Sequence, residues 1–168
     1  MSAPVIALGL DSMNADLLDA WMDAGDLPNL ARLRSQGTYA RQVNTALYRT
    51  ENSWLTFLHG CPPEISGEWG FQDYDPANHR IVERSSYAFR NYAPFHALAA
   101  GKRVIAFDFH YGDVVDGVEG LQVFGWGPEG NVVTCRSEPP GLMAELVERH
   151  GHHPLFPGRD FHGRRVLR

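Results

Sequence analysis

Hydrophobic residues follow two different spacings along the chain. Residues 5–10 form a short, continuous apolar run, which is typical of a strand buried on both faces of a parallel sheet. Elsewhere apolar residues recur every three or four positions, as on one face of a helix. We expect further strands at residues 39–44, 103–109 and 121–124, and helices at 15–24, 30–36, 53–58, 95–100 and 140–150.

Residues that favour helix ends mark most of these boundaries. Ser12 or Asn14 can cap the first helix, and Gly25 follows its last turn. Gly37 closes the second helix, and the Pro62-Pro63 pair stops the third. Residues 66–92 have no clean period, so we expect a long structured loop there.

The alternation of strands and helices predicts an α/β fold with a mostly parallel sheet. We expect one domain at residues 1–158, followed by a basic tail at 159–168 whose arginines meet solvent at a frayed end. The sequence contains no internal repeat and no linker that divides it.

Composition narrows the possible functions. The formal net charge of −5 argues against a nucleic-acid-binding protein that relies on a general basic field. The N-terminus has no basic segment before its short apolar run, so we expect neither a signal peptide nor a membrane span, and we place the chain in the cytoplasm. Cys61 and Cys135, the two cysteines, fit no zinc-binding spacing, and we expect reduced thiols.

Two residues stand where chemistry is common in α/β folds. Asp11 follows the first expected strand, and the carboxyl ends of parallel strands are where such folds bind ligands. It can hold a divalent cation or simply cap the next helix. Thr50 precedes an expected helix, where backbone N–H groups favour an anion. On spacing alone, a helix cap explains Thr50 better than a nucleophile does.

The order of these segments resembles the type I phosphodiesterase/nucleotide pyrophosphatase group of the alkaline phosphatase superfamily. The resemblance rests on Asp11 after its apolar run, on Leu-Pro-Asn-Leu at residues 27–30, and on Thr50 before a helix that ends in Phe-Leu-His-Gly at 57–60. It extends over about residues 4 to 154. It implies an alkaline-phosphatase-like fold, with the sheet sandwiched between helices.

The resemblance also implies roles for single residues. Asp11 matches a metal ligand of the family, and Thr50 matches the nucleophile, which also binds metal. Ser53 falls where some relatives place an asparagine that contacts the substrate phosphate. Glu51 brings a negative charge close to that phosphate, and Arg49 can offset it. His59 replaces the usual threonine, and we expect a structural residue at the helix end.

The family's site holds two divalent metals, usually zinc, and most of its Asp and His ligands lie later than this sequence extends. Asp108, His110, Asp113 and Asp116 form a weaker candidate cluster, and the family has no ligand there. His150, His152 and His153 resemble a surface group at a helix end. We therefore expect an incomplete site in an apparently truncated domain, with an exposed sheet edge that promotes self-association.

Two functions from different classes follow. The first is metal-dependent hydrolysis of phosphodiesters or phosphate monoesters, with a nucleotide-like small molecule as the substrate. The second is a catalytically inactive α/β module, or a fragment of the family, that binds a ligand or protein. A dinucleotide-binding domain is disfavoured, because Gly9-Leu10-Asp11 lacks the clustered glycines of that turn.

Overall fold

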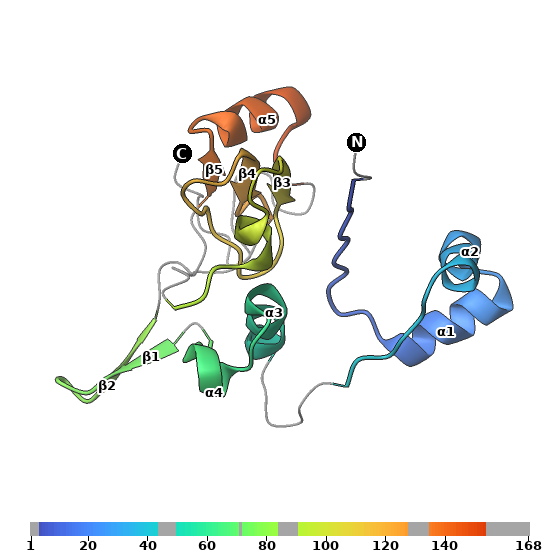
Figure 1. Ribbon diagram of the computed structural model, residues 1–168, viewed down its shortest axis with the longest axis horizontal. Coiled ribbons are helices and arrows are strands. Elements are labelled where there is room, and N and C mark those ends of the chain that lie inside the picture. Colours follow the sequence, from blue (N-terminus) through green and yellow to red (C-terminus); the bar gives the residue numbers. More distant parts are fainter. Residues whose placement is uncertain (1–3, 44–49, 71, 84–90, 128–134, 154–168) are drawn as a thin grey trace. The chain divides into compact units, whose positions relative to one another are not determined.

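The computed structural model describes residues 4–43, 50–70, 72–83, 91–127 and 135–153. The chain divides into two compact units, Met1–Thr45 and Ala46–Arg168 (Figure 1). The expected basic tail at 159–168 lies outside the described residues. None of the helices in the described residues is long and apolar enough to cross a membrane.

The first unit contains two helices, α1 (Ala15–Ala24) and α2 (Pro28–Gln36). Asn14 caps α1: its side-chain oxygen accepts hydrogen bonds from the backbone N–H groups of Asp16, at 2.9 Å, and Leu17, at 3.0 Å. Gly25 ends the helix in the left-handed conformation, with φ of 87°. The sequence prediction for 15–24 is confirmed, and of its two candidate caps the helix uses Asn14.

Residues 39–43 do not form the expected strand. Their polar side chains bind α1 instead: the Tyr39 hydroxyl donates to Asp19 at 2.9 Å, and Arg41 pairs with the same carboxylate at 3.1 Å. Arg34 of α2 also pairs with Asp19, at 3.0 Å. One carboxylate thus joins three segments of this unit, and the prediction of a strand at 39–43 is wrong.

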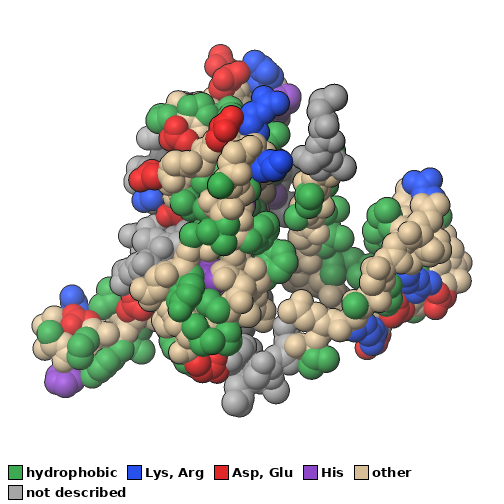
Figure 2. Space-filling view, viewed as in Figure 1, with side chains coloured by type: hydrophobic (Ala, Val, Ile, Leu, Met, Phe, Trp, Pro, Cys, Tyr) green, Lys and Arg blue, Asp and Glu red, His purple; other side chains and the backbone are tan. Residues whose placement is uncertain are grey.

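The apolar segment 4–10 is extended and carries no strand pairing. Val5, Ile6 and Leu8 are 94%, 88% and 78% exposed. Figure 2 shows many hydrophobic side chains at the surface of the molecule. A strand needs neighbours to satisfy its backbone groups, and no strand is present among residues 4–43. The prediction of a buried strand at 5–10 is therefore wrong for this structure.

The second unit begins with α3 (Thr50–His59) and the short helix α4 (Pro63–Ser66). Leu55 and Leu58 are 2% and 1% exposed, so α3 buries its apolar face. The helix begins earlier than the predicted residue 53. Pro63 both follows the end of α3, as predicted, and starts α4.

Within the predicted loop 66–92, two short strands form a hairpin. β1 (Gln72–Asp75) pairs antiparallel with β2 (Arg80–Glu83). The Asp75 side chain accepts the backbone N–H of Ala77 at 3.0 Å and so closes the turn. Polar strand residues hid this hairpin from a hydrophobicity analysis, and the expectation of a loop throughout 66–92 is corrected.

The larger sheet has the order β3-β4-β5, from β3 (Val104–Phe107), β4 (Gly120–Phe124) and β5 (Arg136–Glu138). β3 and β4 are parallel, whereas β4 and β5 are antiparallel. Gly120 has φ of 140°, and a Cβ there would lie 1.9 Å from the Val104 carbonyl oxygen, so only glycine fits.

Two helical elements flank this sheet along the chain, the 3-10 helix η1 (Phe95–Leu98) before it and α5 (Leu142–His150) after it. Phe124, at 1% exposed, centres the core; Phe109 and His96 lie 4.9 Å and 6.4 Å from it, ring centre to ring centre. The described residues thus form a mixed α/β structure with small sheets.

Candidate functional site

Thr50 is the first residue of α3, a ten-residue helix. The first four N–H groups of a helix have no partner within it, and the helix dipole adds partial positive charge at this end. An anion such as a phosphoryl group is therefore favoured there. The structure makes Thr50 the first residue of the helix, whereas the sequence prediction placed it before a helix that begins at residue 53; its side chain lies outside the described residues.

Asn52 lies two residues into the same helix and is 3% exposed. Its side-chain oxygen is buried and has no hydrogen-bond partner within the described structure. Sequence reasoning missed this residue. The signal was present, because Asn52 stands in the i, i+3 row with Leu55 and Leu58, which are both buried.

Ser53, the other candidate near Thr50, is half-buried in the first turn of α3. The Glu51 side chain and Arg49, which the sequence places on either side of Thr50, lie outside the described residues. The charge balance expected from Glu51 and Arg49 therefore stays a prediction.

Asp11 lies in the first unit, on the stretch between the apolar segment and α1. It is exposed and accepts a hydrogen bond from the Ser12 hydroxyl at 3.0 Å. Thr50 belongs to the second unit. Asp11 and Thr50 are thus each placed within their own unit, and their joint role as metal ligands stays a prediction.

His59 is the last residue of α3, as the sequence predicted. Burial lowers the pKa of its imidazole, and the nearby Glu68 carboxylate partly opposes that effect. Glu68 is itself only 3% exposed. A ring enclosed at a helix end fits the structural role expected for His59.

Two members of the weaker candidate cluster, Asp108 and Asp113, make structural contacts. The Asp108 carboxylate accepts the backbone N–H groups of Trp126, at 3.0 Å, and Gly127, at 2.9 Å. Asp113 pairs with Arg136 at 3.3 Å, and burial raises the pKa of this carboxyl. Nowhere in the described part of the chain do three or more His, Cys, Asp or Glu side chains gather as a metal site requires.

The histidines near the end of α5 lie at a helix terminus, as predicted. His150 ends the helix, and His150 and His152 are exposed. The His153 ring lies 4.9 Å from the ring of Trp126, edge to face. Charged side chains gather over α5 in Figure 2, which agrees with a solvated helix end.

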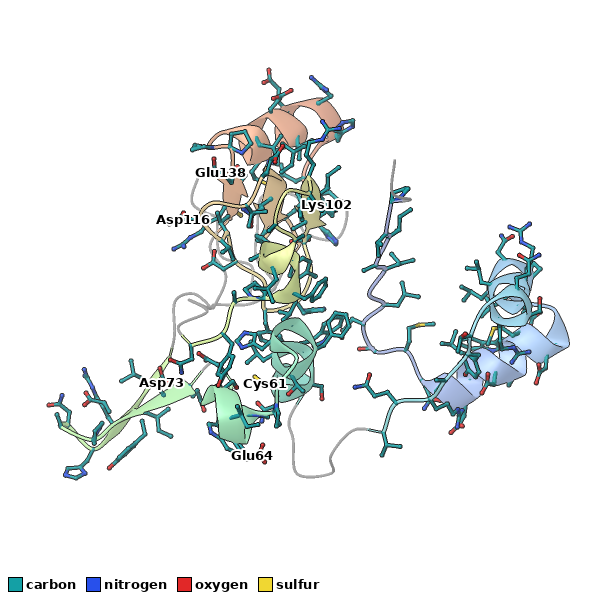
Figure 3. All side chains as sticks on the ribbon, viewed as in Figure 1. Cys61, Glu64, Asp73, Lys102, Asp116 and Glu138 are labelled. Carbon is teal, nitrogen blue, oxygen red and sulfur yellow. The ribbon has the colours of Figure 1, made fainter. Side chains whose placement is uncertain are left out.

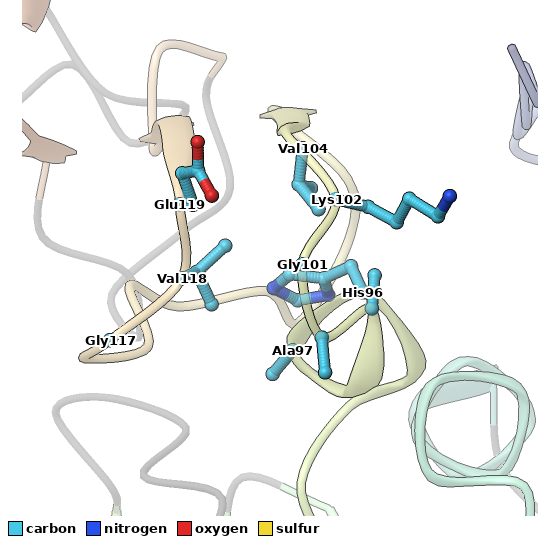
Figure 4. A pocket seen from close by; sticks show the side chains of 10 residues that line it. His96, Ala97, Gly101, Lys102, Val104, Gly117, Val118 and Glu119 are labelled. Atoms are coloured by element: carbon cyan, nitrogen blue, oxygen red, sulfur yellow. The ribbon is translucent and has the colours of Figure 1, made fainter. Parts of the chain in front are cut away.

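A cavity of about 160 Å³ lies where β3 and β4 begin (Figure 4). Its lining includes His96, Gly101, Gly117 and Glu119, while the Lys102 side chain extends away from it. Open α/β sheets bind ligands at the carboxyl ends of their strands, which is the opposite end. The cavity therefore does not lie at the end of β3 and β4 where such sheets bind their ligands.

Comparison with known families identifies the chain. A family model described as type I phosphodiesterase / nucleotide pyrophosphatase matches residues 5–157, which include Asp11, Thr50 and all of α5. Searches of curated proteins and of solved structures gave no match. The family match covers most of the 168 residues. The chain therefore belongs to the type I phosphodiesterase/nucleotide pyrophosphatase family, whose members are phosphoester hydrolases.

Proposed function

We propose that the chain carries part of the active site of a hydrolase of phosphodiesters or phosphate monoesters, with Thr50 as the nucleophile. The observation that carries this proposal is the start of helix α3 at Thr50, within the family match. A hydroxyl at a helix N-terminus meets an anionic phosphoryl group where the helix itself favours negative charge.

The proposed reaction has two steps. The Thr50 oxygen forms a bond to phosphorus, the bond from phosphorus to the leaving oxygen breaks, and that oxygen takes up a proton. Water then attacks the phosphorus of the phosphothreonine, which releases the phosphate product and restores the hydroxyl. Threonine is a weak nucleophile at its ordinary pKa, so this chemistry needs activation from another group.

The family resemblance supplies that activation as two divalent metal ions, with zinc as the expected metal and Asp11 and Thr50 as ligands. Catalytic zinc sites use three protein ligands and an open position. The described residues do not gather such a set, and the sequence contains no Asp followed directly by His. They do not fit a complete zinc centre, so we propose that the metal shell is incomplete within these 168 residues.

Two neighbours of Thr50 are proposed to contact the phosphoryl group or its surroundings. Ser53 is half-buried in the first turn of α3, where its hydroxyl can donate to a phosphate oxygen. Glu51 adds negative charge to the same turn, which opposes an anionic substrate. Glu51→Gln is therefore expected to lower KM.

The alternative is a catalytically inactive module that binds a phosphate ester without cleaving it. The observation that favours it is the use of Asp108 and Asp113 in structural contacts, which leaves neither as a replacement metal ligand. This alternative retains affinity for phosphate esters at the start of α3 but shows no turnover with any metal.

Hydrolysis of bis(p-nitrophenyl) phosphate and p-nitrophenyl phosphate separates the two functions. If the chain is a hydrolase, turnover should require added Zn²⁺, Mn²⁺ or Mg²⁺. It should stop when a chelator is added, and it should be absent in the Thr50→Ala variant. Thr38→Ala, an exposed threonine in the first unit, is the matched control and should keep full activity. Phosphate-ester binding without turnover under all three metals would overturn the enzyme in favour of the binding module.

A further inference from the structure

His96 is a buried histidine that the proposed hydrolysis does not use. It lies in η1 and is 6% exposed, and both of its ring nitrogens are buried without a hydrogen-bond partner in the part of the chain that the structure describes. The nearby Gln122 amide bonds to Val115: its oxygen accepts the Val115 N–H at 3.0 Å, and its nitrogen donates to the Val115 carbonyl at 2.9 Å. Leaving a buried polar group without a hydrogen bond costs free energy, so the imidazole calls for a partner.

The His96 ring lies between the core and a cavity. The ring of Phe109 lies 5.2 Å from it and that of Phe124 lies 6.4 Å from it, ring centre to ring centre. The same imidazole lines the cavity of about 160 Å³ at the beginning of β3 and β4, and Figure 4 shows it among the lining residues. Aromatic packing therefore holds the ring in place, and the cavity gives a partner access to it.

Backbone hydrogen bonds fix the walls of this cavity. The Lys102 N–H donates to the Ala99 carbonyl at 3.0 Å and closes the turn after η1. The Val104 N–H donates to the Glu119 carbonyl at 2.8 Å and joins the two strands where they begin. All the lining residues belong to the second unit. A ligand would therefore enter a preformed site and would not have to order a loop.

The volume limits a ligand to about one six-membered ring. A protein cavity of about 150 Å³ binds benzene, whereas sites for drug-sized ligands measure about 300–1,000 Å³. The space exists because Ala97 and Ala100 have small side chains and because Gly101 and Gly117 have none; a Cβ at either glycine would meet no atom within 4 Å. The cavity is thus too small for a nucleotide, which separates it from the proposed phosphate-ester site.

The charges around the cavity favour a neutral ligand. Burial favours the neutral form of the His96 imidazole. Lys102, just before β3 (Figure 3), extends its side chain away from the cavity (Figure 4), and Glu119 is exposed. An ionised ligand would lose its hydration here without a buried opposite charge among the described lining residues.

We infer that this cavity binds a neutral, ring-sized molecule of the phenol class, whose hydroxyl group hydrogen-bonds to the His96 imidazole. A neutral imidazole has one donor and one acceptor nitrogen. A hydroxyl matches either of them, because it can donate to the bare nitrogen or accept from the N–H. The ring of the ligand fills the space beside Ala97 and Ala100. The inference is independent of the proposed hydrolysis, because neither Thr50 nor a phosphate group takes part.

Phenol and toluene test the inference on the full chain, because they have nearly the same size and only phenol carries a hydroxyl. NMR titrations would follow the amides of Ala97 and Gly117 and the ring of His96. We expect saturable shifts with phenol and a dissociation constant at least about fivefold lower than that of toluene, the factor that one neutral hydrogen bond contributes. Equal affinities, or no saturable shift with phenol, as for a cavity that holds water only, would overturn the inference.

Variants test the position of the ligand. Ala97→Leu fills the cavity and should abolish the phenol shifts, whereas Ala144→Leu, at an exposed alanine of α5, is the matched control and should bind like the wild type. His96→Leu should bind phenol and toluene equally, and Thr50→Ala should bind phenol like the wild type. The comparison of phenol with toluene on the wild-type chain decides the question even if His96→Leu does not fold. Phenol binding that persists in Ala97→Leu, or a preference for phenol that persists in His96→Leu, would contradict the proposed site.

Discussion

Asp108 Oδ1 lies 3.0 Å from the backbone nitrogen of Trp126, and Oδ2 lies 2.9 Å from that of Gly127. The carboxylate at the end of β3 thus holds the chain that leaves β4, the neighbouring strand. Asp108 has φ of 46°, a left-handed conformation that Asp and Asn tolerate better than most residues. Its position and its backbone conformation both fit a structural clamp.

The clamp predicts a graded loss of stability at position 108. Asp108→Asn keeps one acceptor and the tolerance for positive φ, whereas Asp108→Ala loses both. We expect the alanine variant to lower the free energy of unfolding by about 1–3 kcal/mol, and the asparagine variant by less. Urea denaturation measures this, with the exposed Asp116→Ala as the control. Equal losses in the Asp108→Ala and Asp116→Ala chains would refute the clamp.

Because the His96 imidazole is buried, we expect the protein to lose stability in mild acid. The residue is 6% exposed, and burial lowers the pKa of its imidazole, with partial opposition from the nearby Gln122 side chain. The folded state thus favours the neutral ring. Its contribution is complete above the unfolded pKa of about 6.5 and is lost as pH falls toward the lower folded pKa.

Thermal unfolding between pH 7 and pH 5 tests this sign. We expect the wild-type melting temperature to fall with pH in that window and His96→Gln to fall less steeply. His59, whose pKa is also lowered by burial, should keep part of the slope. His152→Gln, at an exposed histidine, should retain the full slope. A His96→Gln chain with the wild-type slope would contradict the account.

The cap of α1 predicts that the stability of the first unit depends on Asn14 and not on Ser12, which lies two residues earlier. Asn14 accepts two backbone N–H groups, whereas the Ser12 hydroxyl donates to Asp11. Asn14→Ala should therefore destabilise the first unit by about 1 kcal/mol, and Ser12→Ala should have little effect. Amide exchange of the first turn of α1 reports this locally, and the reverse ranking would assign the cap to Ser12.

For Thr56 of α3 we expect that removing a polar group leaves the free energy of unfolding unchanged or raises it. Its hydroxyl oxygen is buried and has no hydrogen-bond partner within the described structure. Thr56→Val keeps the shape of the side chain and removes the cost of that unsatisfied group. We expect a change between zero and a gain of about 1 kcal/mol in unfolding free energy. A loss above that size would reveal a hydrogen bond at the hydroxyl.

Local chemistry explains which parts of the fold were predictable. Asn14, Gly25 and Pro63 act on residues next to them in sequence, so the helix boundaries they set were accessible without a structure. The strand at 103–109 and the helix at 140–150 were also found, because their apolar patterns are strong. Those predictions became β3 and α5, each shorter than expected.

The strands that the sequence did not predict correctly depend on pairing between segments that are distant along the chain. The β1–β2 hairpin and β5 consist largely of polar residues, which give no strand signal. The apolar run at 5–10 gave a strong signal without a paired strand in its unit. For the site, sequence order pointed to Thr50 but not to buried Asn52. Asp108 was only a weaker metal candidate in the sequence, and in the structure its carboxylate binds the backbone N–H groups of Trp126 and Gly127.

The most direct test of the central claim is whether Thr50 becomes phosphorylated during turnover. The chain is incubated with p-nitrophenyl phosphate and Zn²⁺, quenched in acid and digested, and the peptide that contains Thr50 is examined by tandem mass spectrometry. The account predicts one phosphoryl group on Thr50, its absence in Thr50→Ala, and its retention in Thr38→Ala. A phosphoryl group on another residue, or turnover that persists in Thr50→Ala, would contradict it.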